Sequence, residues 1–246
     1  MKRVPARRPD GPGIDEVIEE EPLEIRVEGQ AAAVTMRTPG DDLELAVGFL
    51  LTEGVIDGID DVRAVATVAD NVVDVRLAEG VPLHRQRLAD RQLYASSSCG
   101  ICGKASLDRV RARVPHREGW LPEAETIDVV LVSVATRQAQ YAATGGCHAA
   151  ALFDRRGQVL LLREDVGRHN AVDKVLGAHL RAGGDTVGLG LYVSSRAGFE
   201  VVQKAAVAGI GTVIAVGAPT SLAIEGAHDW GLGLVGWARG GRWAIY

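Results

Sequence analysis

After Pro115 the chain alternates between short apolar runs and amphipathic stretches, and this alternation most restricts what it can fold into. Apolar runs of strand length that alternate with helical patterns are typical of α/β proteins, in which helices cover a central sheet. The strands are predicted over residues 129–134, 149–153, 159–162, 187–193, 212–216 and 232–237. Helices are predicted around residues 172–179 and over residues 199–208 and 221–228. The sequence therefore predicts an α/β domain over residues 124–246.

The preceding part of the chain has shorter elements and predicts a smaller α+β domain over residues 21–115. Apolar and charged residues alternate over 23–27, and a second extended run follows over 32–38, so the domain is expected to open with a hairpin. Another pair of strands is predicted over 62–68 and 72–77, because a turn dipeptide lies between them.

A helix is predicted between these two pairs of strands. Asp41 is followed three residues later by Glu44, which is the spacing of a capping box at a helix N-terminus. Apolar residues then recur at helical spacing, and the helix is expected to end near Gly54.

The distribution of charge and hydropathy excludes several classes of protein. The net charge of −5 argues against a nucleic-acid partner, because phosphate contacts need a clustered excess of Lys and Arg. Basic and then acidic residues crowd positions 1–20, which we expect to form a flexible, solvated tail. No apolar run approaches the roughly 20 residues that span a bilayer, and no signal-peptide segment follows the basic start. We therefore expect a cytoplasmic protein with no membrane partner.

Two of the three cysteines, Cys99 and Cys102, stand at C-x-x-C spacing. Apolar residues recur at helical intervals from Cys102 to Val114, so both thiols are expected in the first turn of a helix. There the helix dipole and Lys104 would lower a thiol pKa below its free value of about 8.5. In a reducing compartment such a pair is more often metal-binding or catalytic than a disulfide.

The cysteine pair is compatible with four kinds of site. An all-cysteine structural zinc site needs four thiolates, so His148 or another histidine would have to complete it. A thioredoxin-like site would follow a buried strand, but residues 85–91 are strongly charged. A zinc deaminase would need a proline before Cys99 and a glutamate where Ala150 stands. Sulfur transfer fits the local chemistry, because one thiolate can accept sulfur as a persulfide and the second can release it by exchange.

Residues 144–151 and 163–174 combine glycine, histidine and charge at the ends of predicted strands. Cys147 is expected to be a small buried residue rather than a third catalytic thiol. The second segment packs seven ionisable residues into twelve positions at a strand-to-helix junction. It is interpreted either as a helix capped by Asp165 or Asn170 with its charges in water, or as a loop with a ligand-binding or catalytic role.

Two further segments combine arginine with groups that bind anions. A predicted helix follows Ser194, Ser195 and Arg196. This segment is interpreted either as a phosphate-binding site or as an ordinary serine cap of the helix. Residues 236–242 join the last two strands; they are a simple hairpin turn, or two arginines and an indole that hold a phosphorylated heterocycle.

In their order along the chain, these motifs closely resemble the formate dehydrogenase accessory sulfurtransferase family, the FdhD proteins. The resemblance rests on residues 44–54, 98–103, 144–150, 164–175, 218–222 and 236–239. It implies a sulfur carrier that takes persulfide sulfur from a cysteine desulfurase. The carrier would pass that sulfur to the molybdenum bis(guanine dinucleotide) cofactor, bound as its substrate, before the cofactor enters formate dehydrogenase.

The resemblance also implies a fold and a set of site residues. The family is similar in its C-terminal domain to the three-layer cytidine deaminase fold, and its members pair as homodimers. Cys99 matches the persulfide-bearing cysteine and Cys102 its partner, and we assign no metal ligands. The residues expected at the cofactor are His148, His169, Ser194, Arg196, Trp237, Ala238, Arg239, Gly240, Gly241 and Arg242. A cofactor-binding chaperone without sulfur transfer and a zinc-dependent deaminase-like hydrolase remain the alternatives.

Overall fold

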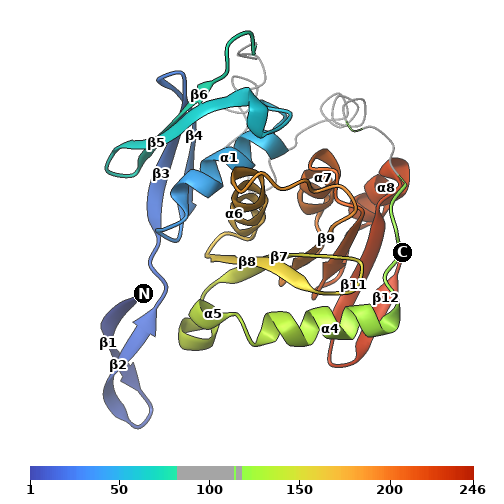
Figure 1. Cartoon of the computed structure of the whole chain (residues 1–246). Helices are drawn as coiled ribbons and strands as arrows, with labels where there is room; N and C mark the ends of the chain where they lie inside the picture. Colours follow the sequence, from blue (N-terminus) through green and yellow to red (C-terminus); the bar gives the residue numbers. More distant parts are fainter. Residues whose placement is uncertain (82–113, 115–117) are drawn as a thin grey trace.

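The computed structural model describes residues 1–81, Val114 and residues 118–246 (Figure 1). The C-x-x-C segment and the helix predicted to follow it lie outside the described residues. In the described part after residue 118, one six-stranded sheet has the order β12-β11-β10-β9-β7-β8. Its strands are β7 (His148–Phe153), β8 (Val159–Asp165), β9 (Gly190–Val193), β10 (Thr212–Ala215), β11 (Gly233–Arg239) and β12 (Arg242–Ile245).

Helices cover both faces of this sheet, which gives three layers (Figure 1). One face carries α6 (Arg168–Arg181), α7 (Phe199–Val207) and α8 (Ser221–Trp230), and the other carries α4 (Ala124–Ala135) and α5 (Ala139–Thr144). Alternate strand residues supply the two interfaces: Ala150 and Leu152 join one apolar cluster, whereas Ala151 and Phe153 join the other. The predicted α/β class is therefore confirmed.

The strand predicted over 129–134 is wrong, because these residues belong to helix α4. β-Branched residues are common in strands, and they are consecutive here. Ile127, Val130 and Val134 lie three and four residues apart, however, and this face of the helix is buried against the sheet. Tertiary packing therefore decided the conformation against local propensity.

The N-terminal part contains a four-stranded sheet in the order β4-β3-β6-β5 that packs on helix α1 (Asp42–Thr52). β3 (Glu21–Val27) and β4 (Gln30–Arg37) form one antiparallel hairpin, and β5 (Val62–Ala69) and β6 (Val72–Leu77) form another. β3 and β6 run parallel in the middle, and a short 3₁₀ turn, η1 (Ile59–Asp61), precedes β5. The predicted elements are confirmed, and together they make a smaller α+β unit.

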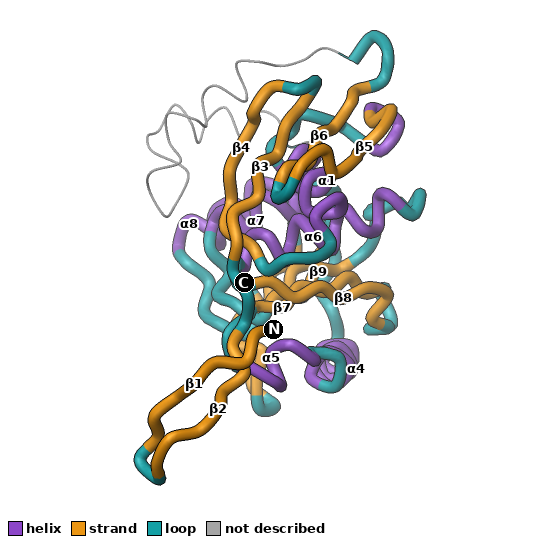
Figure 2. The backbone as a smooth tube through the Cα atoms, turned by 90° about the vertical axis from the view of Figure 1, so that its left-hand side faces the viewer, coloured by secondary structure: helices purple, strands orange, loops and turns teal. Residues whose placement is uncertain are grey.

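Residues 1–20, predicted as a flexible tail, instead contain a two-stranded antiparallel hairpin. Its strands are β1 (Lys2–Arg8) and β2 (Gly11–Val17), and the hairpin projects from the body of the molecule (Figure 2). Most of its side chains are exposed, and oppositely charged ones pair across it, as Arg8 does with Asp15 at 2.9 Å. The separated basic and acidic blocks thus face one another across a hairpin.

Two glycines let α1 and α6 approach closely, and this contact joins the N-terminal unit to the α/β layers. A Cβ atom on Gly48 would overlap the backbone of Asp173, and one on Gly177 would overlap the carbonyl oxygen of Glu44. A single apolar cluster accordingly runs from β3 and α1 through α6 to β9 and β10. The predicted boundary between residues 115 and 124 stays a prediction, since the described parts on either side share this core.

Among the described residues, no helix is both long enough and apolar enough to cross a membrane.

Candidate functional site

Several strands of the six-stranded sheet end or begin at the same edge, the one formed by the carboxyl ends of its parallel strands. β9, β10 and β11 are parallel, so their carboxyl ends lie together, and β7 is antiparallel to β9, so its first residue lies there too. In α/β sheets this edge is where ligands usually bind. It brings together His148 at the start of β7, Ser194 directly after β9 and Trp237 near the end of β11.

Backbone hydrogen bonds hold the loops at this edge side by side. The Gly217 N–H after β10 donates to the Ser195 carbonyl at 3.0 Å, and the Trp237 N–H donates to the Gly217 carbonyl at 3.1 Å. Arg196 crosses Gly217 so closely that a Cβ there would lie 2.9 Å from the Arg196 Cα. The loop that carries Arg196 is therefore anchored, while the Arg196 side chain itself is exposed.

His148 is half-buried and lies against Ser194. Its Nδ1 is 3.4 Å from the Ser194 Oγ, and that oxygen accepts a hydrogen bond from the Ala149 N–H at 2.9 Å. Burial lowers the pKa of His148, and the nearby charges of Arg168 and His169 lower it further. His148 is therefore neutral at neutral pH.

His169 and Arg168 begin helix α6 beside His148. The His169 Nε2 lies 2.8 Å from the Glu200 Oε2, which belongs to the first turn of α7. This contact ties the first turn of α6 to that of α7. The structure thus brings together residues that the sequence singled out in three separate segments: His148, the neighbouring Arg168 and His169, and Ser194.

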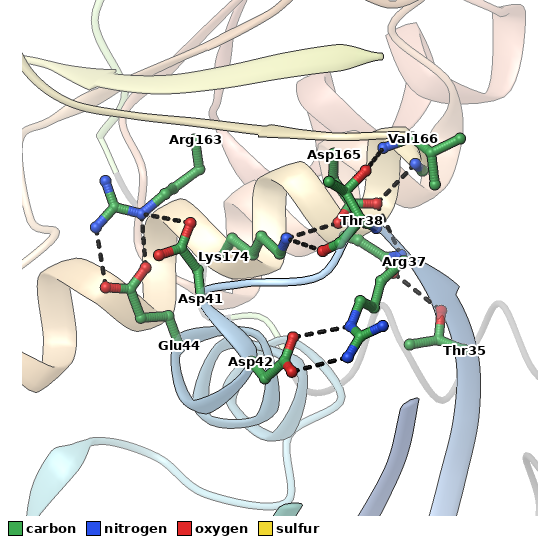
Figure 3. A network of polar contacts seen from close by, with 12 residues as sticks. Thr35, Arg37, Thr38, Asp41, Asp42, Glu44, Arg163, Asp165, Val166 and Lys174 are labelled. Atoms are coloured by element: carbon green, nitrogen blue, oxygen red, sulfur yellow. Dashed lines mark hydrogen bonds and ion pairs between the residues drawn. The ribbon is translucent and has the colours of Figure 1, made fainter. Parts of the chain in front are cut away.

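A buried polar network fixes the loop between β8 and α6 (Figure 3). The Asp165 carboxylate is completely buried and accepts from the Lys174 Nζ at 2.8 Å, the Thr38 N–H at 3.1 Å and the Gly167 N–H at 2.8 Å. The Thr38 Oγ1 in turn accepts from the Val166 N–H at 3.0 Å. The N-terminal unit therefore holds the loop that leads directly to Arg168 and His169.

The interpretation of residues 163–174 as a capped helix with its charges in water is wrong. Helix α6 has Gly167 at its N-cap and no side-chain cap. Asp165, Asp173 and Lys174 are buried, each with a partner from the N-terminal unit or from another helix. The sequence could not reveal this, because Thr38 lies 127 residues from Asp165.

The capping box predicted for α1 is also absent. Asp41 has a left-handed backbone conformation and makes no side-chain cap, and Glu44 pairs with Arg163 of β8 through contacts of 2.6 and 2.9 Å (Figure 3). A two-pronged pair between a guanidinium and a carboxylate is stronger than a single bond to a helix N–H. Glu44 therefore connects α1 to the α/β layers.

Sequence reasoning missed a second buried cluster, centred on Lys204 of α7. Its Nζ lies 2.9 Å from both carboxylate oxygens of Asp173 and 2.7 Å from the Thr52 Oγ1, with Glu53 at 3.3 Å. Burial raises the pKa of Asp173, and Lys204 opposes that effect. The isolated lysine on an otherwise apolar face of residues 199–208 was the one available hint.

Cys147 is buried, as predicted, and its thiol is held in the protonated form. Its Sγ lies 3.5 Å from the Glu164 Oε1, and Glu164 also accepts from the N–H groups of Gln140 and Tyr141. Burial and the neighbouring carboxylate raise the pKa of Cys147 to about 12. A thiol in this state is a poor nucleophile at neutral pH.

The segment from Trp237 to Arg242 contains the end of β11, the hairpin turn at Gly240 and Gly241, where the backbone is left-handed, and the start of β12. Trp237 is 46% exposed, and the Arg239 guanidinium lies 5.9 Å from the centre of its ring. Ala238 is completely buried against the layer that contains α4, so its side chain does not face a surface ligand. Arg239 and Arg242 lie opposite one another across the hairpin, and both are exposed.

Other features of the described residues lie away from this edge. A cavity of about 270 Å³ opens beside Trp120, His228 and Tyr246, and none of the sequence-predicted site residues lines it. Within residues 1–81 and 118–246, no group of three or more His, Cys, Asp or Glu side chains is arranged to hold a metal ion. Cys99 and Cys102 lie outside the described residues.

Comparisons with known proteins agree on one family. The model of the FdhD/NarQ family matches residues 18–246. Proteins named "Sulfur carrier protein FdhD" from Streptomyces avermitilis and Anaeromyxobacter dehalogenans are 46% and 44% identical. Each alignment covers 94% of this chain, together with 87% and 86% of the respective relative.

A solved structure of a formate dehydrogenase accessory protein from Desulfotalea psychrophila has the same fold. It superposes with a TM-score of 0.77 and covers 100% of this chain and 95% of its own. At 24% identity this likeness shows the fold alone.

Proposed function

The chain belongs to the FdhD/NarQ family, and on that premise we propose that it is a sulfur carrier. Cys99 and Cys102 accept a sulfane sulfur from the persulfide of a cysteine desulfurase. The carrier then transfers this sulfur to the molybdenum bis(guanine dinucleotide) cofactor, its substrate, before the cofactor is inserted into formate dehydrogenase. The relatives' shared name supports the carrier role.

The protonated, buried state of Cys147 is the observation that supports Cys99 and Cys102 as the sulfur-accepting residues. The sequence contains three cysteines. Cys147 is buried and hydrogen-bonded to Glu164, and its thiol stays protonated at neutral pH because its pKa is raised to about 12. Sulfur acceptance requires a thiolate, so this chemistry is left to Cys99 and Cys102. Their spacing suits a relay in which the second thiolate attacks the persulfide of the first, so that a Cys99–Cys102 disulfide forms and the outer sulfur leaves at the sulfide level.

The edge of the sheet supplies groups that suit the anionic cofactor. Arg196, Arg239 and Arg242 are exposed, and the planar guanidinium binds phosphate oxygens in a two-pronged manner. The exposed indole of Trp237 offers a face for a nucleobase, since aromatic rings stack readily on heterocycles. We place the guanine dinucleotide ends of the cofactor along this edge, and formate dehydrogenase and a second copy of the chain as further partners.

Mass spectrometry after incubation with a cysteine desulfurase and cysteine tests the proposal. The wild-type protein is expected to gain the mass of a sulfur atom on the peptide that contains Cys99 and Cys102. The Cys99→Ala and Cys102→Ala variants should lose or reduce this gain, whereas the matched control Cys147→Ala should keep it. If the Cys99→Ala/Cys102→Ala double variant still activated formate dehydrogenase fully, the protein would instead be a chaperone that only shelters the cofactor.

A further inference from the structure

Gly217 lies between two neighbouring backbone segments at the carboxyl edge of the sheet, the loop after β9 and the end of β11. Its N–H donates to the Ser195 carbonyl at 3.0 Å, and its carbonyl accepts from the Trp237 N–H at 3.1 Å. The first segment carries Arg196 and the second carries Trp237. One residue therefore joins the backbone of the exposed arginine to that of the exposed indole.

The absence of a side chain at Gly217 lets the Arg196 backbone approach closely. A Cβ atom there would lie 2.9 Å from the Arg196 Cα and Cγ and 3.0 Å from its nitrogen. Carbon atoms pack best about 3.5–4.0 Å apart, so any side chain would displace Arg196 by roughly 0.5–1 Å. The φ angle of Gly217 lies outside the left-handed region, so its conformation does not require glycine. Space beside Arg196 is what glycine provides here.

The backbone on both sides of Arg196 is fixed, although its side chain is exposed. Ser195 and Ala197 are buried, and the Ala197 carbonyl accepts from the Thr220 N–H at 3.1 Å. Together with the bond from Gly217 to Ser195, this contact leaves the Arg196 backbone no free movement relative to the loop after β10. The guanidinium thus extends from a fixed point of attachment.

Trp237 is held in a strained backbone conformation at the other side of Gly217. Its φ angle is +58°, and Trp237 and Ala238 together oppose Trp243 of β12, which is the two-against-one count of a β-bulge. Glycine is the usual residue at the left-handed position of a bulge, because a Cβ atom strains it. Such strain persists only where neighbouring contacts impose it, and the bond to Gly217 is one of these contacts.

The bulge changes which side chain faces the solvent. Ala238 remains in the apolar cluster beneath α4, whereas the Trp237 indole is 46% exposed. An exposed indole gains little from burial to offset the backbone strain. The conformation is therefore explained by the place where it puts the ring.

We propose that Gly217 is a positioning residue that sets the separation of Arg196 and Trp237 so that both engage one nucleoside diphosphate. This inference rests on the proposed function, in which the dinucleotide ends of the cofactor lie along this edge, and it adds the residue that couples the two contacts. A base and a phosphate joined through one ribose have a limited range of separations. A pair of contacts at the matching separation binds them together with an advantage that neither contact has alone.

Three ligands distinguish this role from a purely structural one. Inorganic pyrophosphate can use the arginine without the indole, and guanosine can use the indole without the arginine. Guanosine diphosphate uses both, so it alone depends on their separation. The long Arg196 side chain can follow a free phosphate after a small backbone shift, and a stacked base tolerates such a shift as well. A general loss of folding at Gly217 would instead weaken all three ligands alike.

Calorimetric titration of the full chain with these three ligands tests the proposal. Gly217→Ala should weaken guanosine diphosphate roughly tenfold or more, which corresponds to about one charge-assisted hydrogen bond, and leave pyrophosphate and guanosine unchanged. Gly198→Ala is the matched control, two residues from Arg196. A Cβ atom there meets nothing within 4 Å and the backbone is extended, so all three affinities should stay at the wild-type value.

A second variant changes the same separation from the other side. A Cβ atom on Gly236 would lie 2.7 Å from the Pro219 Cδ, so Gly236→Ala should push β11 away from the loop after β10. It should reproduce the selective loss of guanosine diphosphate, and it decides the question if Gly217→Ala does not fold.

Replacements of Trp237 test the strain itself. Trp237→Ala and Trp237→Gly both remove the indole and should weaken guanosine diphosphate, whereas Trp237→Phe should retain most of the affinity because it keeps a ring. Trp237→Gly should unfold at a higher urea concentration than Trp237→Ala. This order reverses the usual one for a strand, because glycine adopts left-handed backbone without a Cβ penalty.

Four results would overturn the inference. They are wild-type affinity for guanosine diphosphate in Gly236→Ala and in any folded Gly217→Ala protein, an equal loss for all three ligands, wild-type protein that binds guanosine diphosphate no more tightly than pyrophosphate, and greater stability of Trp237→Ala than of Trp237→Gly. Sulfur loading of Cys99 and Cys102 is measured in parallel. Normal loading with any of these results refutes the positioning role alone, and the predicted selective loss without loading refutes the carrier role alone.

Discussion

Replacement of Gly48 by alanine should lower the free energy of unfolding by about 2 kcal/mol. This figure is the cost of overpacking minus the gain in helix propensity. The new Cβ would lie 2.6 Å from the carbonyl carbon of Asp173 and 2.9 Å from the backbone nitrogen of Gly177. Carbon atoms pack best about 3.5–4.0 Å apart and the Asp173 carbonyl oxygen lies closer still, so α1 and α6 would have to separate by more than about 1 Å. Backbone atoms cannot rotate away as a side chain can, and the whole helix must move.

The magnitude follows from two opposing terms. Overpacking a core costs about 1–3 kcal/mol, and the upper end applies here because the obstruction is backbone. Alanine in a helix is better than glycine by about 1 kcal/mol, which offsets part of that cost. Separation of the helices would also stretch the bond from the Thr52 Oγ1 to the Asp173 carboxylate, now 2.8 Å, so the offset is not complete.

Urea unfolding followed by circular dichroism measures the effect. Gly58→Ala is the control, because a Cβ there meets open space and the backbone is extended. The Gly48→Ala/Gly177→Ala double variant should cost clearly less than the sum of the two single variants, since one separation of the helices accommodates both methyl groups. A Gly48→Ala protein within about 0.5 kcal/mol of wild type would refute the reasoning, because that is the range of a neutral surface change.

Three further predictions address charge and sulfur chemistry. Arg242→Ala should weaken binding of guanosine diphosphate by about 1.5–3 kcal/mol, the strength of a charge-assisted hydrogen bond, while sulfur loading stays normal; unchanged affinity would remove the hairpin turn from the site. Lys204→Met should cost about 3–5 kcal/mol in urea unfolding, because it leaves the buried Asp173 without its positively charged partner, whereas loss of Arg8 from its exposed pair should cost less than about 1 kcal/mol. Cys147, with a pKa of about 12, should resist iodoacetamide near neutral pH in the folded protein and react once the chain is unfolded, and rapid labelling of the native protein would contradict its protonated, buried state.

Apolar residues that recur every two positions, as in strands, or every three to four, as in helices, predicted most of the fold. The hairpins of the N-terminal unit and the strands after residue 148 lie where alternation and turn residues indicated, as Asn71 does with its left-handed backbone between β5 and β6. Helix α4 was missed because a run of β-branched residues obscured a buried face at helical spacing. Local sequence patterns gave wrong predictions where a residue distant in the sequence forms a stronger contact. Glu44, for example, pairs with Arg163 instead of capping α1.

The site shows the same division between local and distant information. Glycine, histidine and serine at strand ends indicated a ligand edge, and the structure brings His148 and Ser194 into contact there. Nothing in the sequence indicated that Asp165 is a buried hub, because its partners Thr38 and Lys174 come from the loop before α1 and from α6. Long-range partners become visible only when the chain is folded.

The packing of α1 on α6 and the loop that leads to Arg168 and His169 are physically connected. Asp165 accepts a hydrogen bond from the Thr38 N–H of the N-terminal unit, and only Val166 and Gly167, whose N–H groups bond to Thr38 and Asp165, separate it from Arg168 and His169. The chain that leaves β6 toward Cys99 and Cys102 starts from the same N-terminal unit. A displacement of that unit would therefore move the start of α6 and the end of β6 together. The close contact at Gly48 thus fixes Arg168 and His169 relative to the N-terminal unit.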